Sequence, residues 1–512
     1  MSESEASPAK RRGREWIESN RSSITELSDE VWECAEPALR EYDSARAHVR
    51  FLEEHGFDVE HGIAGMPTAF VATYGTDGPV MGFYAEYDAT PGNSQEQATI
   101  EKSPIAEGGS GFEDIHNGLG TAGTAAAVAT RYAIEAEDLD GQVKILGTPA
   151  EKLCIGKVYL AREGYLDDLD ATVAWHPHSH NTVTRYSGPG PYRTAIVDFE
   201  GVGVYGGSPW DGVSALDAAT MTLNMVEQMK EHVPRDAYPS VNELITNGGQ
   251  CLTNLPKTTQ IWFAYRSRSQ AHEVLDEIRD TIERAAAAAA DVTGAEYEFR
   301  EVAATRPWLP NTVMTDVAYE NMEQVGPPSF TDEDRELGRE LLEEVGIDPP
   351  ERPFDETLSP PEAEVCGNFN PDLATYVDEF DWNEVGEFNW ADDVTEFSWH
   401  SPTAWIHTTY FLEGAYESRL PTWTTAALAT TNVAHETILT ATKIMTGTAV
   451  DLLTEPERLE RAQAEYRERT DDEYVPVLLD ENVEPPTGAE DSFPPFYPES
   501  WTNPVYAARS DK

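Results

Sequence analysis

Between residues 80 and 177 the sequence alternates short apolar runs with segments of helical spacing, and this alternation limits the fold more than any other feature. In chain order the segments are an apolar run at 80–88, a Gly- and Ala-rich helical stretch at 118–133, an apolar run at 142–147, a helical stretch at 157–163 and an apolar run at 171–177. Strands that alternate with helices form a mostly parallel sheet with helices on both faces. We therefore predict an α/β fold.

From about residue 192 the pattern changes to longer strands and amphipathic helices. The segments are a strand at 193–201, a helix at 215–232, strands near 243–246 and at 259–266, a helix around 285–290 and a strand at 295–302. This β-α-β-β-α-β order is typical of the ferredoxin-like sandwich. We predict an inserted α+β domain at 191–305 and a first domain made of 1–190 and 306–512. An acidic, Pro-rich stretch at 348–364 is predicted to be a surface loop.

The chain carries 93 acidic and 36 basic residues among its 512, which gives a net charge of -57. The acidic residues are spread over the whole length, a pattern typical of a solvated acidic surface that stays soluble where salt screens self-repulsion. We interpret it as halophilic adaptation to a high-salt cytoplasm, in preference to binding of cations or of a basic partner. Binding to nucleic acid is not expected, because phosphate neutralisation requires basic patches.

Cysteine usage and hydropathy indicate the compartment. The four cysteines are Cys34, Cys154, Cys251 and Cys366, and no two form a CxxC pair, which fits a reducing compartment better than a disulfide framework. The first sixteen residues contain charge but no apolar run, and nowhere do 18 apolar residues follow one another. We expect a soluble cytoplasmic protein that does not contact a membrane.

Four segments place His, Asp or Glu where sites in open α/β sheets usually lie, at or beside strand ends. They are AEYDATPGNSQ (85–95), EDIHNGLGTAG (113–123), GTPAEK (147–152) and WHPHSH (175–180). Each residue, considered alone, has a more ordinary interpretation. Asp114 and His116 are then loop or capping residues, His176 is a structural histidine at a strand end, and Glu151 is one partner of an ion pair. Taken together, a carboxylate and two imidazoles are a ligand set that suits zinc or a similar divalent ion.

Further motifs follow these four segments in order. They are SPWDGVSALDA (208–218), ITNGGQ (245–250) with Asn254 and Pro256 after it, SWHSPTAW (398–405) and DLLTEPERLERA (451–462). The whole series resembles the metallo-amidohydrolases of the aminoacylase/carboxypeptidase superfamily, peptidase family M-twenty, and within it the aminobenzoyl-glutamate utilization protein B group. The resemblance implies a catalytic α/β domain with an inserted ferredoxin-like lid, which agrees with the domains predicted above.

In that family two divalent ions share a bridging ligand, and a Glu beside them acts as general base in the hydrolysis of an amide bond. Carried onto this sequence, the resemblance implies that Glu151 is the general base, that His116 and His176 are metal ligands, and that Asp88 is the acid that supports them. Asp114 falls at the bridging position, where closer relatives have Cys and the wider superfamily has Asp. Asp and His ligands suit zinc and manganese alike.

Three positions depart from the family pattern. Lys152 stands where a second Glu binds metal, and Pro421, in LPTW, stands where a His completes the pair. Tyr205 replaces a lid His that reaches across a dimer to hold the oxyanion, although a Tyr hydroxyl can still donate a hydrogen bond there. Other histidines could compensate, and their more ordinary interpretation is a supporting or surface role: His178, His180 and His400.

The resemblance implies that the losses at Lys152 and Pro421 fall on the same ion, because in the superfamily the second Glu and the C-terminal His bind one metal. We therefore predict one divalent ion per chain, zinc or manganese, held by Asp114, His116 and His176, with Lys152 as a fixed positive charge in place of the second ion.

The expected function is hydrolysis of the amide bond of an N-acyl or aminobenzoyl amino-acid conjugate, with Glu151, Asp88 and Tyr205 as the catalytic residues. The resemblance also implies a homodimer that forms through the lid. The alternative is a catalytically inactive relative that binds a small molecule or a homologous subunit.

Overall fold

The computed structural model describes most of the chain. The described residues are 6–179, 181–185, 188–233, 239–249, 251–267, 272–349, 391–410, 420–472 and 474–487. The predicted surface loop at 348–364 therefore lies almost wholly outside the described residues, as does His180.

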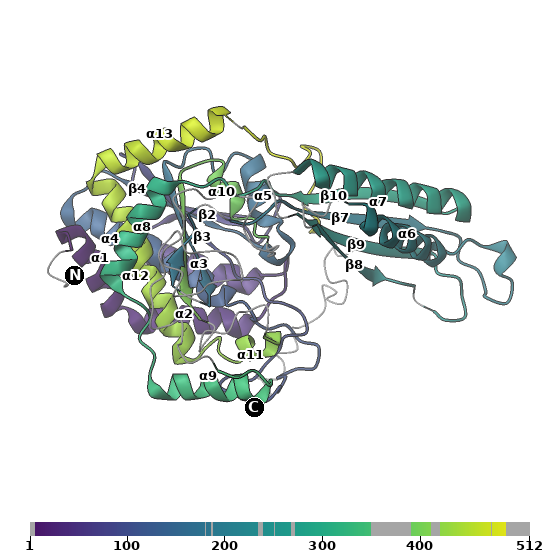
Figure 1. The fold of residues 1–512 in the computed structure, drawn as a ribbon, viewed down its shortest axis with the longest axis horizontal. Helices are drawn as coiled ribbons and strands as arrows, with labels where there is room; N and C mark the ends of the chain where they lie inside the picture. The colour runs from purple at the N-terminus through teal and green to yellow at the C-terminus, as the bar shows by residue number, and fades with distance from the viewer. Residues whose placement is uncertain are drawn as a thin grey trace.

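A seven-stranded sheet forms the centre of the larger part of the molecule (Figure 1). Its strands, in spatial order, are β1 (Asp58–His61), β2 (Phe70–Tyr74), β4 (Gln142–Gly147), β3 (Val80–Ala85), β5 (Ala171–His178), β11 (Thr403–Thr409) and β6 (Thr182–Val183). The four central strands β4, β3, β5 and β11 run parallel, whereas the outer strands pair antiparallel. The α/β fold predicted from the alternating pattern is confirmed.

Two long helices rich in small residues pack directly on the central strands. They are α4 (His116–Glu137) and α12 (Asn432–Thr454), which also contact each other. Most of their residues are buried, and Ala, Gly and Thr predominate, so the helix backbones can approach the sheet closely. The main apolar core joins these helices to both sides of β3 and β5.

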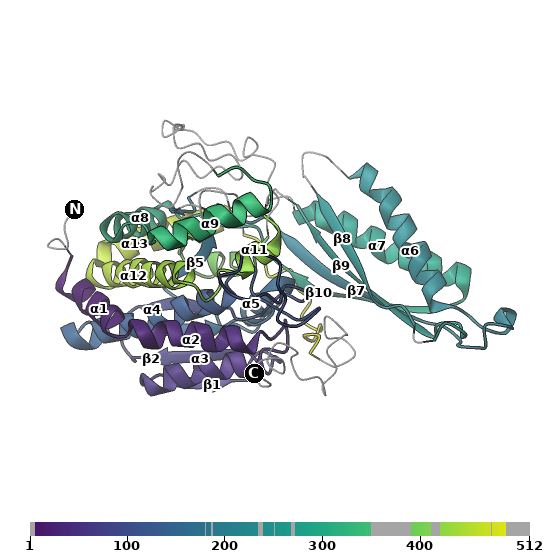
Figure 2. The same ribbon diagram turned by 90° about the horizontal axis from the view of Figure 1, so that it is seen from below.

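The remaining helices of this part surround the core (Figures 1 and 2). They are α1 (Pro8–Ser19), α2 (Arg21–Cys34), α3 (Tyr42–Glu54), α5 (Gly156–Arg162), α8 (Thr312–Val325), α9 (Asp332–Glu344), α10 (Thr395–Ser398), α11 (Thr422–Ala426) and α13 (Pro456–Asp472). Local signals start several of them. The Ser7 side chain accepts a hydrogen bond from the amide of Lys10, and Thr331 with Asp334 forms a capping box.

A second, four-stranded antiparallel sheet extends to one side of the first (Figure 2). Its spatial order is β10 (Glu296–Ala304), β7 (Tyr192–Glu200), β9 (Thr258–Arg266) and β8 (Ser240–Asn247), and it carries the helices α6 (Ala215–Met229) and α7 (His272–Thr293). The chain order is β7, α6, β8, β9, α7, β10, and these elements have an apolar cluster of their own. We keep 191–305 as the proposed extent of an inserted lid.

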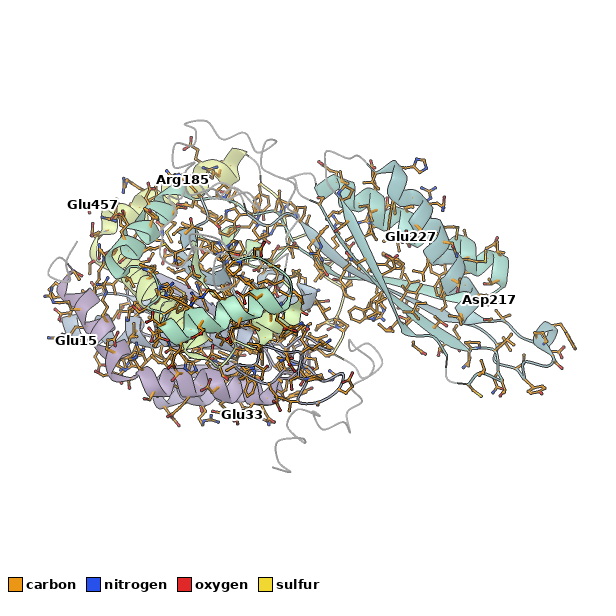
Figure 3. The ribbon with its side chains drawn as sticks, turned by 60° about the horizontal axis from the view of Figure 1, so that its bottom comes forward. Glu15, Glu33, Arg185, Asp217, Glu227 and Glu457 are labelled. Atoms are coloured by element: carbon orange, nitrogen blue, oxygen red, sulfur yellow. The ribbon has the colours of Figure 1, made fainter. Side chains whose placement is uncertain are left out.

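Charged side chains cover both parts of the molecule. Figure 3 labels five exposed acidic residues that lie on the helices α1, α2, α6 and α13: Glu15, Glu33, Asp217, Glu227 and Glu457. Among the described helices, none is both long enough and apolar enough to cross a membrane.

Candidate metal and catalytic site

The candidate residues meet at the carboxyl ends of three neighbouring parallel strands. Glu86 and Asp88 directly follow β3, Glu151 and Lys152 follow β4, and His176 lies near the end of β5. Because these ends meet at one edge of the sheet, side chains from distant parts of the sequence come together there.

Helix α4 brings His116 to this edge, because His116 is its first residue. The helix approaches the end of β3 so closely that only glycine fits at two positions. A Cβ atom on Gly120 would lie 2.3 Å from the carbonyl oxygen of Glu86, and one on Gly123 would lie 2.0 Å from that of Tyr84. The glycines of HNGLGTAG therefore position His116 beside the strand end.

Asp114, His116 and His176 converge on one point. Oδ2 of Asp114 lies 3.4 Å from Nε2 of His176 and 3.5 Å from Nε2 of His116. The other ring nitrogen of each histidine, Nδ1, forms a hydrogen bond elsewhere. In His116 it lies 2.7 Å from Oδ1 of Asp88, and in His176 it lies 2.7 Å from the carbonyl oxygen of Pro177. Both rings thus present Nε2 to the same carboxylate, the orientation in which imidazoles bind a metal ion.

Glu151 lies next to the same nitrogen of His116. Its Oε2 atom is 3.5 Å from His116 Nε2, and its side chain is buried apart from a small exposed fraction. Burial, followed by the charges of Asp392 and Glu86, raises the pKa of Glu151 well above its usual value. A buried carboxyl group with a raised pKa, next to candidate metal ligands, is a candidate for proton transfer.

A buried cluster of acidic residues, which the sequence pattern did not indicate, lies next to His116. Oε2 of Glu86 lies 3.5 Å from His116 Nε2, and its other carboxylate oxygen accepts a hydrogen bond from Lys157. The ammonium of Lys157 also contacts Asp393 and lies 3.9 Å from Asp392. One signal was available, because Glu86 is two residues before Asp88 and shares its side of the extended chain.

No family model matches the chain, but individual known proteins are similar to it. The chain is 29% identical over 483 residues to one component of the p-aminobenzoyl-glutamate hydrolase of Escherichia coli, a match that covers 92% of this chain and 97% of that protein. It is 27% identical to the Xaa-Arg dipeptidase of Mus musculus, over 64% of this chain and 74% of the relative. These similarities agree with the resemblance to the aminoacylase/carboxypeptidase superfamily that the sequence motifs carry.

A solved structure has the same fold. The aminobenzoyl-glutamate utilization protein from Klebsiella pneumoniae superimposes with a TM-score of 0.51 at 17% identity, over 83% of this chain and 97% of that one. A similarity at this level of identity concerns the fold alone.

Lys152 and Pro421, two of the three departures from the family pattern, are connected through other polar residues. Nζ of Lys152 lies 2.9 Å from Asp114 Oδ2 and 3.9 Å from a carboxylate oxygen of Glu113. Glu113 in turn accepts a hydrogen bond from Asn93, whose Oδ1 accepts one from Thr422, the residue after Pro421, at 2.6 Å. A short chain of polar contacts therefore links the two positions.

The donor set fits a divalent ion. Glu86 Oε2, Asp114 Oδ1 and His116 Nε2 are buried and have no hydrogen-bond partner among the described residues. Such orphaned polar atoms are costly unless something binds them, and imidazole nitrogens with carboxylate oxygens suit zinc or manganese. For Asp114, burial favours the neutral acid, but Lys152 and His176 outweigh it and hold the pKa of that carboxyl well below its usual range. Asp114 is therefore anionic at neutral pH.

Other residues singled out in the sequence do not join this cluster. Tyr205 lies in the loop after β7, where 69% of it is exposed, and its backbone pairs with Asn254. His400 contacts Arg306 and Asp167, each at 2.8 Å. The ring of His178 lies against that of His407, with centroids 5.2 Å apart. None of these positions supplies the ligand that Pro421 lacks.

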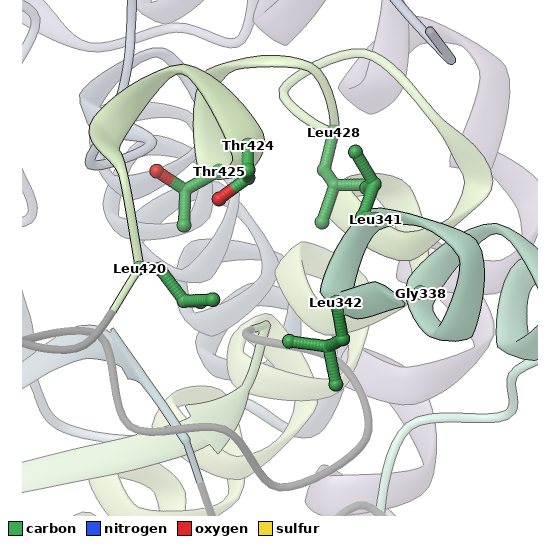
Figure 4. Close-up of a pocket in the computed structure, with 7 residues that line it drawn as sticks. All are labelled: Gly338, Leu341, Leu342, Leu420, Thr424, Thr425 and Leu428. Atoms are coloured by element: carbon green, nitrogen blue, oxygen red, sulfur yellow. The ribbon is translucent and has the colours of Figure 1, made fainter. Parts of the chain in front are cut away.

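A small apolar cavity lies between α9 and α11 (Figure 4). Its lining consists of Gly338, Leu341, Leu342, Leu420, Thr424, Thr425 and Leu428. These described lining residues carry no ionisable group, so we assign no chemical step to the cavity.

Proposed function

We propose that this protein is a metal-dependent amidohydrolase that cleaves the amide bond of an N-acyl or aminobenzoyl amino-acid conjugate with one divalent ion, zinc or manganese. The convergence of Asp114, His116 and His176 on one point, with Glu151 beside it, supports this proposal most directly. The similarity to the p-aminobenzoyl-glutamate hydrolase of Escherichia coli supports the substrate class.

Asp114, His116 and His176 would hold the ion, and Asp88 would keep His116 in the tautomer that leaves Nε2 free. When bound, such an ion lowers the pKa of a water molecule and polarises the substrate carbonyl. Glu151 would take the proton from the attacking water and pass it to the leaving nitrogen.

Lys152 would replace a second ion as a fixed positive charge. Its ammonium group binds the same Asp114 oxygen that faces both histidines, so one carboxylate oxygen would serve a metal ion on one side and an ammonium on the other. An ammonium repels a cation at this distance. We therefore propose one ion per chain.

Arg266 supports a substrate with a carboxylate. It lies at the end of β9 with its guanidinium 5.1 Å from the ring centre of Tyr192, and its Nε atom is buried without a hydrogen-bond partner among the described residues. The thiol of Cys154 is close enough to Arg266 and to Glu151 to be affected by both charges. We propose that Arg266 binds the carboxylate of the amino-acid half, since guanidinium groups match carboxylates in shape and charge.

We further propose a homodimer that forms through the lid in a high-salt cytoplasm. Exposed apolar side chains gather at the lid, in the loop that follows β7 and in the segment before β9: Val202, Tyr205, Trp210 and Leu252. Apolar groups of this size are usually covered in the working assembly. In a dimer Tyr205 would reach the partner's site and donate to the oxyanion. Light scattering in molar salt tests the state of assembly, and a monomer at all concentrations would contradict it.

Hydrolysis assays test the main proposal. Aminobenzoyl-glutamate, hippurate and acyl-amino acids should be assayed in molar salt with zinc, manganese or cobalt, with metal content measured on the same samples. We expect hydrolysis of at least one substrate, one equivalent of metal, and a loss of about 10²–10⁴-fold in kcat in Glu151→Gln. Full activity in Glu151→Gln would refute the role of the base. No hydrolysis of any substrate would favour a binding protein.

A further inference from the structure

A second carboxylate, Glu41, holds the turn that carries Glu151. Glu41 directly precedes α3 and is fully buried. One of its oxygens, Oε1, accepts the backbone N–H of Ala150 at 2.8 Å across 109 residues of sequence. The same oxygen accepts the N–H of Leu39 at 2.9 Å, and Oε2 accepts the hydroxyl of Thr68 at 3.0 Å.

The two amides that share this oxygen belong to residues in an unusual conformation. Ala150 has φ +58° and Leu39 has φ +64°, both in the left-handed region that residues with a side chain seldom adopt. Such a conformation costs on the order of 1 kcal/mol or more and persists only where the surroundings hold it. Glu41 therefore stabilises two strained backbone positions with one carboxylate oxygen.

Asp88 holds the same turn from the other side. Its Oδ2 atom accepts the backbone N–H of Lys152 at 2.9 Å, while its Oδ1 contacts His116. The amides of residues 150 and 152 are thus each held by a buried carboxylate, and Glu151 is the residue between them. The carbonyl of Ala150 is engaged as well, because it accepts the N–H groups of Leu153 and Ile155 at 3.2 Å each.

We propose that Glu41 is a positioning residue for Glu151. By fixing Ala150 in its left-handed conformation, Glu41 aims the Glu151 carboxylate at the space beside His116. Glu41 itself touches neither the candidate ligands nor the substrate space, because its carboxylate is used by Leu39, Thr68 and Ala150. This inference rests on the proposed role of Glu151 as general base.

Three variants of Glu41 separate positioning from simple stability. Glu41→Gln keeps an acceptor oxygen for Ala150, whereas Glu41→Ala removes it and Glu41→Asp withdraws it by one methylene. We expect kcat to fall about 10–100-fold in the Ala and Asp variants, with KM changed less than about twofold, because a displacement near 1 Å can cost that much. Glu41→Gln should stay within about threefold of the unchanged enzyme.

Glu465→Ala is the matched control. Glu465 also accepts backbone amides at a helix start, those of Thr312 and Val313 at 3.0 Å each, but it lies on α13, away from the site. We expect it to lower the melting temperature without lowering kcat. If Glu41→Ala loses kcat only in proportion to a loss of folded protein, as a merely structural role requires, the proposal is wrong.

Hydrogen exchange of the peptide that covers residues 148–155 tests the same contact without any assay of activity. We expect faster exchange in Glu41→Ala and Glu41→Asp than in Glu41→Gln; equal protection in all three would overturn the proposal. The activity of Glu151→Gln, measured alongside, separates the hypothesis that Glu151 is the general base from the hypothesis that Glu41 positions it. Full activity in Glu151→Gln defeats the proposed base, whereas an inactive Glu151→Gln beside a fully active Glu41→Ala defeats only the positioning role.

Discussion

Lys152 and Asp114 form an ion pair inside the candidate metal site, with Nζ 2.9 Å from Oδ2. That oxygen also faces the Nε2 atoms of His116 and His176. A single carboxylate oxygen thus stands between an ammonium and two imidazoles. In the proposed mononuclear site, the ammonium would supply the positive charge that a second cation would otherwise bring.

Restoring the two missing ligand types should restore a second ion. The double variant Lys152→Glu with Pro421→His replaces an ammonium by a carboxylate and a proline by an imidazole, at two positions that a short chain of polar contacts connects. We expect about two equivalents of zinc per chain after dialysis, against one in the unchanged protein, as measured by elemental analysis. Each single change should add less than one equivalent. One equivalent in the double variant would contradict the mononuclear interpretation.

Asp88→Asn should weaken metal binding without unfolding the protein. Asp88 accepts from His116 and from the amide of Lys152, and an amide group at this position cannot enforce the same tautomer. We expect zinc affinity to fall about 10–100-fold in competition titrations with a chelator, as for other partners of ligating histidines. Asp170→Asn is a suitable control, because Asp170 accepts the N–H of Val80 at the far end of β3. An equal loss of affinity in the control would count against this role.

Gly123→Ala should separate α4 from the sheet. The added Cβ would lie 2.0 Å from the carbonyl oxygen of Tyr84, which belongs to the strand backbone and cannot rotate away. We expect a loss of about 1–3 kcal/mol in the free energy of unfolding, the usual effect of overpacking. Because His116 begins the same helix, zinc affinity should fall too. Denaturant unfolding and chelator competition on the same preparation measure both, and unchanged values would show that the helix can move freely.

His48 should make stability depend on pH below about 6.5. It is fully buried in α3 with Nδ1 2.9 Å from the Thr124 hydroxyl, and burial lowers its pKa to about 3. The unfolded chain takes up a proton near pH 6.5, but the folded protein resists it until about pH 3, so stability is lost as the pH falls through this window.

The size of this effect is about 1.4 kcal/mol for each pH unit, or about 2 kcal/mol at pH 5. His48→Gln remains neutral, so its free energy of unfolding should fall less steeply between pH 7 and pH 5 in urea titrations at constant salt. Other groups contribute equally to both proteins, so the difference between the two slopes isolates His48. Parallel slopes would show that His48 is protonated in the folded protein.

The cluster could be predicted from the sequence only in part. Asp114, His116, His176 and Glu151 follow apolar runs or begin a helical one, so their meeting at one sheet edge follows from the order of strands. Glu86 stood in the same motif as Asp88 but was not identified. The contact between Lys157 and Asp393 could not be predicted from the sequence pattern, because it joins residues that are 236 positions apart.

The sequence by itself determined the strand and helix order, the acidic surface and the set of donor groups, because hydrophobic periodicity and composition are local properties of the chain. Only the tertiary structure decided which charges pair. It placed Lys152 on Asp114, Lys157 among the acids behind His116, and Glu41 on the amide of Ala150. Ion pairs and buried hydrogen bonds depend on distances between residues that are remote in sequence, and packing of the helices on the sheet fixes those distances.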